Sequence, residues 1–196
     1  MLFLKASEVE KENYKLMSGA ILPRPIAWIT TLQENGKVNV APFSYFNIVS
    51  AQPPLLSVSI RYDTDNQKDT SRNIFRNKEF VVHIISEEYM EQANKTSKPL
   101  SNIESELDYA SLSQVPSKLI KTPGLKESKI RLECVYETHL KLETTDLIIG
   151  RVVGFHIEEE LFSNGKIDLE KLRPVSRLSG SRYGLIGEIK HVPKET

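Results

Sequence analysis

The sequence predicts a mainly β protein with peripheral helices, folded as a single antiparallel β-barrel. Short apolar runs alternate with turn signals along the chain, which is typical of many short strands with a few helices between them. About six or seven strands are indicated, and their order favours antiparallel pairing over a doubly wound sheet. Gly150 and Gly154 lie inside one predicted strand and indicate a bend or bulge. The chain has 196 residues, so we expect one domain over residues 1–196.

The first half of the chain predicts a hairpin followed by a half-buried strand. "PIAWITTL" (residues 25–32) is expected to be a strand, with "KVNVAPFSYF" (residues 37–46) as its return strand. Asn35-Gly36 between them is a strong signal for a two-residue hairpin turn. "PLLSVSIRY" alternates along its length, as a strand with two different faces does. Its predicted faces are Leu56, Val58, Ile60 and Tyr62 on one side, and Leu55, Ser57, Ser59 and Arg61 on the other.

Two helices and a long connection are predicted next. "KDTSRNIFRNKE" (residues 68–79) reads as a helix with Asp69 or Thr70 as its N-cap. "FVVHIIS" is a buried strand, and "SEEYMEQANKTS" is a helix capped by Ser86 with acidic residues in its first turn. Residues 98–128 contain several prolines and few apolar runs, so we expect a long excursion with one helical turn around "NIESELDYA".

The last third of the chain predicts a long hairpin and then a loop. "KIRLECVYETHLKLE" is the clearest strand, and "LIIGRVVGFHIEEE", joined to it by "TTD", is its expected antiparallel partner. The apolar face of the first strand is expected to hold Ile130, Leu132, Cys134, Tyr136, Leu140 and Leu142; the other face holds Arg131, Glu133, Glu137, His139 and Lys141. "FSNGKID" contains another Asn-Gly turn, and "LRPVSRLSGSRYGLIG" is expected to be a loop.

Composition and charge exclude several classes of function. Lys plus Arg and Asp plus Glu both number 26, so no net charge attracts the chain to nucleic acid or anionic membranes. We therefore expect neither as a partner, and the neutral charge leaves self-association unopposed. Cys134 is the only cysteine, which rules out a disulfide within the chain and favours a reducing, cytoplasmic location. The N-terminus lacks the apolar core of a signal peptide, and no apolar run has the length of a membrane helix.

Common catalytic motifs are missing from the sequence. His83, His139, His156 and His191 have no metal-ligand spacing to one another or to Cys134, so no metal site is expected. The chain contains no G-x-S-x-G, no P-loop and no G-x-G-x-x-G. The sequence therefore does not indicate a serine hydrolase, a P-loop nucleoside triphosphatase or a Rossmann-fold enzyme.

Three features of the sequence could take part in a ligand site, and each also has an ordinary explanation. The helix start in "QKDTSRN" suits phosphate, with Lys68 and two hydroxyl residues beside it, although a capped surface helix is the commoner explanation of this motif alone. The face with Ser57, Ser59 and Arg61 is either a solvated sheet face or a surface on which a flat ligand lies close to the backbone. Trp28 at strand spacing is more often a core residue than a cofactor wall.

Four segments together resemble a known family. "RPIAWITT", "NVAPFSYFNIVSAQPPLLSVSI", "KDTSRNIFRNKEFVV" and "PVSRLSGSRYG" occur in the order and style of the flavin reductase-like, FMN-binding split-barrel family, which includes flavoredoxin-like proteins. The resemblance runs over about residues 16–184. It implies an antiparallel split β-barrel of the FMN-binding type, a homodimer, and one FMN per subunit near the dimer interface.

The resemblance also implies which residues bind the cofactor. One side of the flavin would be lined by Arg24, Trp28, Thr30 and Thr31. The isoalloxazine ring would be followed by Asn39, Ala41, Pro42, Ser44, Phe46 and Asn47. The ribityl chain or phosphate would be approached by Ser59 and Arg61, and the phosphate end closed by Lys68, Asp69, Thr70 and Asn73. Arg177 and Tyr183 would complete the pocket, from the same subunit or from its partner.

The function implied by the resemblance is an FMN-binding oxidoreductase of flavin reductase type. NADH or NADPH would transfer hydride to the flavin, which would pass electrons to free flavin or to another acceptor such as a redox partner protein. Because the flavin carries this chemistry, no catalytic side chain is expected. Two alternatives stay open: an FMN-binding electron carrier that takes no hydride from a nicotinamide, and a cofactor-free barrel that binds another molecule. The sequence does not distinguish NADH from NADPH, or a tightly bound FMN from one exchanged as a substrate.

Overall fold

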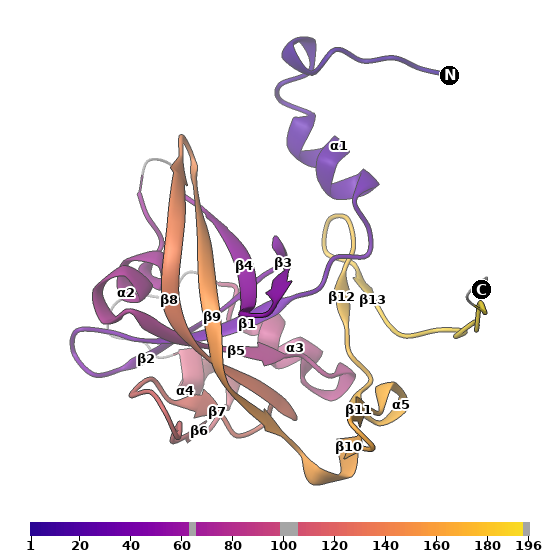
Figure 1. The fold of residues 1–196 in the computed structure, drawn as a ribbon. Helices are drawn as coiled ribbons and strands as arrows, with labels where there is room; N and C mark the ends of the chain where they lie inside the picture. Colours follow the sequence, from indigo (N-terminus) through magenta and orange to yellow (C-terminus); the bar gives the residue numbers. More distant parts are fainter. Residues whose placement is uncertain (63–65, 99–105, 194–196) are drawn as a thin grey trace.

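The structure is a computed structural model that describes residues 1–62, 66–98 and 106–193. Its centre is a seven-stranded antiparallel sheet with the strand order β2-β1-β5-β8-β9-β4-β3, which curls into a barrel (Figure 1). The predicted mainly β architecture with peripheral helices is therefore confirmed. The seven strands are β1 (Ala27–Leu32), β2 (Val38–Phe43), β3 (Phe46–Ala51), β4 (Pro54–Arg61), β5 (Glu79–Ile84), β8 (Ile130–Leu142) and β9 (Thr145–Ile157).

Short helices and three two-stranded ribbons surround the barrel. The helices are α1 (Asn13–Ala20), α2 (Asp69–Asn77), α3 (Met90–Lys95), α4 (Glu106–Ala110) and α5 (Leu169–Leu172), with 3₁₀ turns at Ala6–Glu8, Glu87–Tyr89 and Glu159–Leu161. The ribbons pair β6 (Gln114–Val115) with β7 (Gly124–Leu125), β10 (Phe162–Ser163) with β11 (Lys166–Ile167), and β12 (Ser176–Arg177) with β13 (Tyr183–Gly184). In the described ranges, no helix combines the length and apolar character that crossing a membrane requires.

The interior of the barrel follows from the alternation of β4. Leu56, Val58 and Ile60 are buried in the barrel core, as predicted, while Ser57 and Ser59 are only partly buried on the opposite face. This core is continued by apolar side chains of β5, β8 and β9 and by Ile74 of α2, which packs against the barrel interior. Apolar burial on one face of each strand thus sets the register of the sheet.

A second core lies outside the barrel, between β1, β2 and β5 and the helices α3 and α4. Trp28 and Val40 are fully buried there against Ala93 of α3 and Ala110 of α4. Of the predicted helical turn around "NIESELDYA", α4 supplies the second half, and residues 102–105 lie outside the described residues. The helices α3 and α4 therefore cover one outer face of the barrel.

The long β8–β9 hairpin departs from simple alternation. The register shifts between Glu133 and Cys134 and again between Tyr136 and Thr138, so the side-chain alternation changes face along β8. Leu140 and Leu142, which were predicted to share the apolar face of Cys134, are instead exposed. Glu133, which was predicted to lie on the polar face, is fully buried. The predicted irregularity of the partner strand is confirmed by these bulges.

Gly150 shows why the hairpin needs a glycine at one of these irregular positions. A Cβ placed on Gly150 would lie 2.4 Å from Cζ of Phe80 in the barrel core. No ordinary side chain fits there without displacing the phenyl ring. The close approach of β9 to the ring of Phe80 therefore requires a glycine at this position.

Several turn and cap predictions need correction. The β1–β2 hairpin exists, but its connection spans residues 33–37 and is not a two-residue turn; Asn35 Oδ1 accepts from Lys37 N at 2.9 Å and Gly36 has φ +80°. The Asn164-Gly165 turn is a two-residue connection with both φ values positive, as its sequence predicted. The tail predicted as a loop forms the ribbon β12–β13.

The predicted helix caps are also wrong. Lys68, not Asp69 or Thr70, is the N-cap of α2, and its side chain makes no capping hydrogen bond. Ser86 precedes its 3₁₀ turn as predicted, but its hydroxyl makes no capping hydrogen bond. In both cases the helical segment begins close to the predicted position, but the N-cap side chain makes no capping hydrogen bond.

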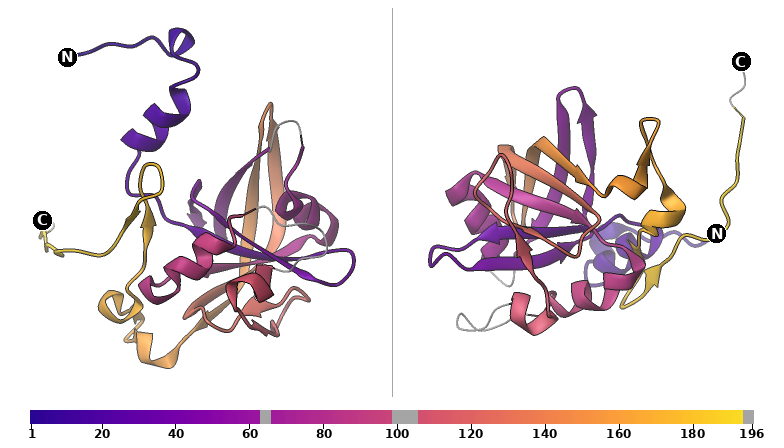
Figure 2. Two further views of the ribbon diagram at one scale, coloured as in Figure 1. Left: turned by 180° about the vertical axis from the view of Figure 1, so that it is seen from behind. Right: turned by 90° about the horizontal axis from the view of Figure 1, so that it is seen from below.

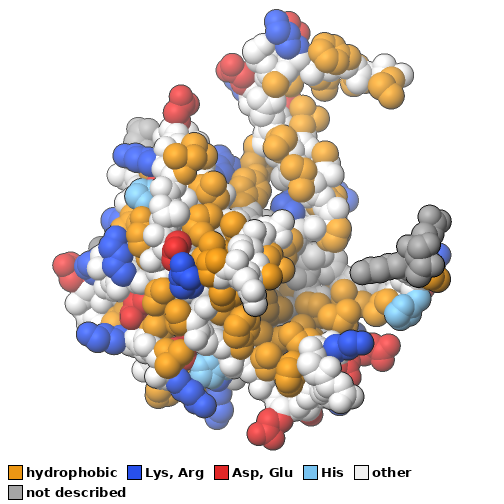
Figure 3. Space-filling view, in the orientation of Figure 1, with side chains coloured by type: hydrophobic (Ala, Val, Ile, Leu, Met, Phe, Trp, Pro, Cys, Tyr) orange, Lys and Arg blue, Asp and Glu red, His pale blue; other side chains and the backbone are white. Residues whose placement is uncertain are grey.

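Both ends of the chain stand away from the barrel. The segment with α1 and the tail after β13 project from the same side of the molecule in both lateral views (Figures 1 and 2). Hydrophobic side chains cover the N-terminal segment (Figure 3), and Leu2, Phe3, Met17 and Ile21 are among its exposed residues. Such extended apolar arms leave surface that the barrel itself does not cover.

His83 on β5 is held in one protonation state. Its ring is fully buried, Nδ1–H donates to the carbonyl of Trp28 at 2.8 Å, and Nε2 accepts from Leu125 N at 2.8 Å. Both partners fix the neutral ring, because protonated Nε2 could no longer accept. Burial lowers the pKa of His83 to about 3, and the charge of Arg131 acts in the same direction.

We expect acid to destabilise the fold through His83. The unfolded chain takes up this proton near pH 6.5, whereas the folded chain does so only near pH 3, so stability is lost as the pH falls through this window. The loss is about 2 kcal/mol between pH 7.5 and pH 5.0. Urea unfolding at the two pH values should show that His83→Gln removes this loss and the exposed-tail control His191→Gln keeps it. Equal pH dependence in both variants would contradict the assignment.

Candidate functional site

A large hollow near the predicted site lies between α1 and the barrel. This cleft, called the α1 cleft, has a volume of about 560 Å³. It is lined by Asn13, Tyr14, Met17, Ile21, Pro23, Arg24, Pro25, Ser44, Tyr45, Phe46, Asn47, Arg61 and Thr145. Five of these are predicted flavin residues, namely Arg24, Ser44, Phe46, Asn47 and Arg61. The structure thus brings the β2–β3 corner and the end of β4 to one aromatic-walled surface.

A smaller cavity adjoins the α1 cleft. This hairpin cavity has a volume of about 200 Å³ and lies between α1, the β2–β3 corner and the β12–β13 ribbon. It is lined by Tyr14, Ser18, Arg24, Ile26, Pro42, Ser44, Ser97, Arg177, Leu178, Gly180 and Tyr183. The two hollows share Tyr14, Arg24 and Ser44. Pro42, Arg177 and Tyr183 of the predicted set are therefore next to the α1 cleft.

Arg24 ties together the three pieces that form these hollows. Its Nη1 donates to the carbonyls of Ser18 at 2.6 Å and Ile21 at 2.8 Å, and its Nη2 donates to the carbonyl of Leu178 at 3.0 Å. The guanidinium therefore holds the end of α1 and the β12–β13 ribbon against the start of β1. Arg24 is a structural brace as well as a lining residue.

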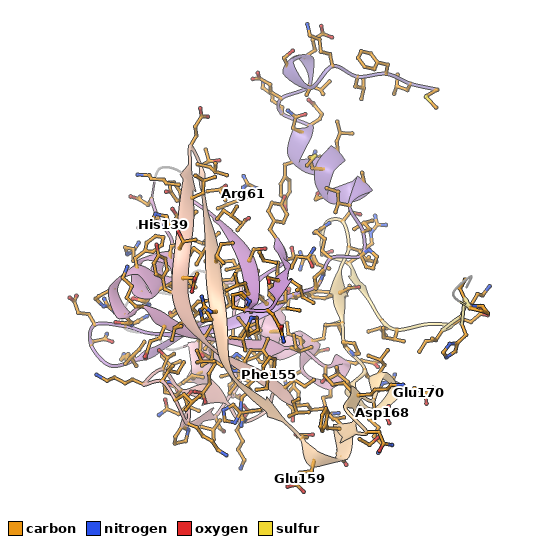
Figure 4. All side chains as sticks on the ribbon, viewed as in Figure 1. Arg61, His139, Phe155, Glu159, Asp168 and Glu170 are labelled. Atoms are coloured by element: carbon orange, nitrogen blue, oxygen red, sulfur yellow. The ribbon has the colours of Figure 1, made fainter. Side chains whose placement is uncertain are left out.

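Aromatic and cationic groups meet across the α1 cleft. The guanidinium of Arg61 lies 4.9 Å from the ring centroid of Tyr14, a cation–π distance, and Figure 4 shows Arg61 on the side of the barrel that faces α1. On the other hollow, Arg177 lies 4.9 Å from the ring centroid of Tyr183 and donates to its hydroxyl at 2.9 Å. Tyr183 Oη in turn donates to Asn94 Oδ1 at 3.1 Å. Both hollows therefore offer flat ring surfaces beside positive charge.

A buried hydrogen-bond network carries four of the residues predicted for the flavin site. Asn39 Nδ2 donates to Thr70 Oγ1 at 3.0 Å and to Thr31 Oγ1 at 3.3 Å, and Asn73 Nδ2 donates to Thr31 Oγ1 at 3.0 Å. All four side chains are at most 5% exposed. Because β1 and β2 supply two members and α2 supplies the other two, the network docks α2 onto the end of the barrel. The amide and hydroxyl groups of these four side chains are therefore hydrogen-bonded to one another.

The connection from β4 to α2 is held from both sides by one buried carboxylate. Asp146 on β9 is fully buried and accepts from Tyr62 Oη and from Gln67 Nε2, each at 2.9 Å. Tyr62 directly follows β4 and Gln67 precedes α2 by two residues. Asp146 therefore positions the start of α2 relative to the end of β4.

Trp28 and Thr30, which were predicted beside the flavin, line neither the α1 cleft nor the hairpin cavity. Both are fully buried in or beside the outer core. Trp28 Nε1 donates to Thr96 Oγ1 at 2.9 Å, and Thr30 Oγ1 donates to the carbonyl of Pro123 at 2.7 Å. Strand alternation places them on the face of β1 opposite to Thr31, where α3 and the long excursion cover them.

The remaining predicted residues lie near the network and on the outer face of β4. Ala41 and Ser59 are partly buried on β2 and β4, and the backbone N–H of Ser59 donates to Tyr45 O at 2.8 Å. Lys68 is the N-cap of α2, and Asp69 in the first turn forms an ion pair with Arg72. Asp69 and Asn73 also line a hollow of about 410 Å³ beside the β1–β2 turn.

The sequence pattern did not single out the contribution of α1. Tyr14, Met17 and Ile21 line the α1 cleft together with Tyr45 and Thr145. The available signal was an aromatic residue and two apolar residues near one end of the chain, in a segment that carried little of the family resemblance. Nothing in the sequence around Asn94 indicated that it would accept a hydrogen bond from Tyr183. In the described ranges, no three His, Cys, Asp or Glu side chains cluster so that they could hold a metal ion.

The chain belongs to the flavin reductase-like domain family, whose model matches residues 17–171. It is 47% identical over 186 residues to the uncharacterized protein YwrF of Bacillus subtilis (strain 168), and the match covers 91% of each chain. Family membership and the predicted family resemblance therefore agree.

Solved structures show the same fold. Nitrilotriacetate monooxygenase component B from Bacillus cereus is 46% identical, with a TM-score of 0.95 and a match over 98% of each chain. A protein with a split barrel domain from Shewanella frigidimarina NCIMB 400 is 22% identical, with a TM-score of 0.87 over 100% of each chain, and shows the fold alone. The predicted antiparallel split barrel is therefore confirmed.

We expect Asp146→Ala to loosen the start of α2. The change leaves Tyr62 and Gln67 without their shared acceptor and should lower the free energy of unfolding by about 1–3 kcal/mol. Hydrogen–deuterium exchange should show faster exchange in the first turn of α2. A matched control is Asp168→Ala, which removes the cap of α5 and should cost about 1 kcal/mol without this local effect. Unchanged protection of α2 in Asp146→Ala would show that Asp146 does not position the helix.

Proposed function

We propose that this protein is an FMN-binding oxidoreductase of flavin reductase type that takes hydride from NADH or NADPH. The observation that carries the proposal is the α1 cleft, a hollow of about 560 Å³ with tyrosine and phenylalanine walls, arginines at its sides and no Asp or Glu in its lining. A flat, anionic, aromatic ligand suits such a surface. Membership of the flavin reductase-like family supports the choice of a flavin as that ligand.

The ring of FMN would lie along the corner between β2 and β3. Pro42, Ser44, Phe46 and Asn47 would line it, and the backbone there would supply donors and acceptors. Ser59 and Arg61 on the outer face of β4 would lie on the path from the ring toward α2. This placement uses the small side chains of that face, which leave room for a ligand near the backbone.

The FMN phosphate would lie at the start of α2. The side chain of the N-cap residue makes no capping hydrogen bond to this nine-residue helix, so the first backbone N–H groups of α2 are candidates to bind an anion. Ser71 in the first turn is fully buried, and its Oγ has no hydrogen-bond partner among the described residues. An uncapped helix start with an orphaned buried hydroxyl fits a phosphate ester. Lys68 would add a positive charge at this end.

The flavin supplies the redox chemistry when bound, and the chain's residues position it and exclude water. Arg24 and Arg61 place positive charge near the ring, which favours a flavin that has gained negative charge on reduction. Tyr14 and Met17 supply part of the cleft wall that α1 forms. No side chain needs to transfer a proton for this role.

A second protein would consume the reduced flavin. The similar Bacillus cereus structure is named as one component of a nitrilotriacetate monooxygenase, which supports a partner that uses the flavin's electrons. A homodimer would suit the exposed apolar residues of the α1 arm and the exposed edge strand β3, where Ile48 is 79% exposed. The electron-carrier alternative differs from this proposal only in lacking hydride transfer from a nicotinamide.

The visible spectrum tests the proposal. Purified protein titrated with FMN should bind it and shift its absorption bands, and anaerobic NADH or NADPH should then bleach the band of the oxidised flavin. Bleaching by neither nucleotide would leave an FMN-binding electron carrier. Failure to bind FMN would remove both flavin functions and leave the cofactor-free binding protein.

Lys68→Ala should weaken FMN binding while leaving riboflavin binding nearly unchanged. The lost charge-assisted contact to the phosphate is worth about 1.5–3 kcal/mol, or roughly ten- to a hundredfold in affinity. Quenching of flavin fluorescence measures both ligands, and Lys78→Ala at the other end of α2 is the control. Equal losses for FMN and riboflavin would place the phosphate elsewhere.

A further inference from the structure

Two arginines lie opposite each other beside the hairpin cavity. Arg24 and Arg177 form an isolated antiparallel bridge, with Arg24 N donating to Arg177 O at 3.1 Å and Arg177 N donating to Arg24 O at 2.8 Å. Side chains of directly opposed residues lie on the same face, where two like charges destabilise the pair. Both line the hairpin cavity of about 200 Å³. The fold therefore holds two positive charges at the wall of one small space.

In the described part of the chain, no carboxylate is paired with either of these charges. Arg24 is only 8% exposed, its Nη atoms bond to carbonyls, and its Nε is buried without a hydrogen-bond partner among the described residues. Within the same residues, neither Arg24 nor Arg177 forms a salt bridge, and no Asp or Glu lines the hairpin cavity or the α1 cleft. A buried charge is costly unless an opposite charge accompanies it. Among the described residues, backbone carbonyls accept from the Nη atoms of Arg24, but no carboxylate offsets its charge at this cavity.

The walls indicate the chemistry of an anion that would suit this cavity. Guanidinium groups pair with phosphate through charge-assisted hydrogen bonds, and the hydroxyl of Ser44 adds a further donor. The volume is below the roughly 300 Å³ at which pockets for whole small molecules begin. A phosphate or diphosphate group fits this space, while an aromatic ring belongs in the adjoining α1 cleft.

The hairpin cavity is separate from the proposed FMN phosphate end. Asn39 of β2 contacts Thr70 at the start of α2, whereas Pro42 of the same strand lines the hairpin cavity. Three residues of strand separate these positions by about 10 Å. FMN carries one phosphate, so a second phosphate-binding place indicates a second phosphorylated ligand.

We propose that the Arg24–Arg177 pair binds the diphosphate of the nicotinamide dinucleotide that donates hydride. This inference rests on the proposed function and extends it by locating the donor. Because the hairpin cavity shares Tyr14, Arg24 and Ser44 with the α1 cleft, a diphosphate bound there leaves the attached nicotinamide within reach of the flavin ring. Arg24 and Arg177 are binding residues for the donor in this account.

The test is calorimetric titration of ADP, a diphosphate without nicotinamide, into the FMN-saturated protein. Arg177→Gln should weaken ADP binding by at least about tenfold. The control Arg182→Gln changes an exposed arginine of the same ribbon that lines neither hollow and should leave ADP affinity within about twofold. Ser97→Asp adds a carboxylate to the cavity without removing an arginine, so it should weaken ADP in the same way even if Arg177→Gln disturbs the ribbon.

Parallel titrations with FMN and riboflavin separate the two phosphates. The proposal expects both variants to keep the wild-type ratio of FMN to riboflavin affinity. It is overturned if wild-type protein does not bind ADP, if both variants bind ADP as tightly as wild type, or if they weaken FMN but not riboflavin. The last result would assign the cavity to the flavin phosphate. Failure of wild-type protein to take up FMN contradicts the proposed function instead, and ADP titration of the FMN-free protein then tests the anion site by itself.

Discussion

The docking of α2 onto the barrel is the constraint on which the rest of the candidate site depends. Asn39 donates to Thr70 of the helix and to Thr31 of β1, so three elements share one buried polar centre. Such a network is stable only when its members are satisfied together, which fixes the helix in one position. Ile74 of the same helix packs into the barrel core. The polar contacts thus orient α2, and the apolar contact supplies most of the attraction.

Strand β2 carries that constraint to the hollows. Its first half binds α2 through Asn39, and its end leads through Pro42 into the corner that lines both hollows. A ligand along β2 would therefore find an uncapped helix start at one end and arginines at the other. Arg24 fixes the second end by bracing α1 and the β12–β13 ribbon. The site is assembled from segments far apart in sequence, held by a few polar contacts to backbone.

The strands were predictable because burial on one face imposes a period of two, as β4 shows with Val58 and Ser59. That rule failed along β8, where a bulge between Tyr136 and Thr138 shifted the faces and left Leu140 exposed. Hydroxyl partners were less predictable. From the sequence, Thr70 was expected to cap the helix or to bind a phosphate. Its hydroxyl oxygen instead accepts a hydrogen bond from Asn39, because the partner of a hydroxyl depends on tertiary contacts that the local sequence does not specify. The sequence analysis did not predict the contribution of α1 to the cleft, because no local sequence pattern indicates where a segment that projects from the barrel will lie.

A crystal structure of the protein grown with FMN would show whether the β2–β3 corner holds the ring and the start of α2 holds the phosphate. We expect the isoalloxazine to lie against Ser44 and Phe46, and the phosphate to lie within hydrogen-bond distance of Ser71 and the first backbone N–H groups of α2. A flavin phosphate between Arg24 and Arg177, or a ring remote from the α1 cleft, would contradict this placement of FMN.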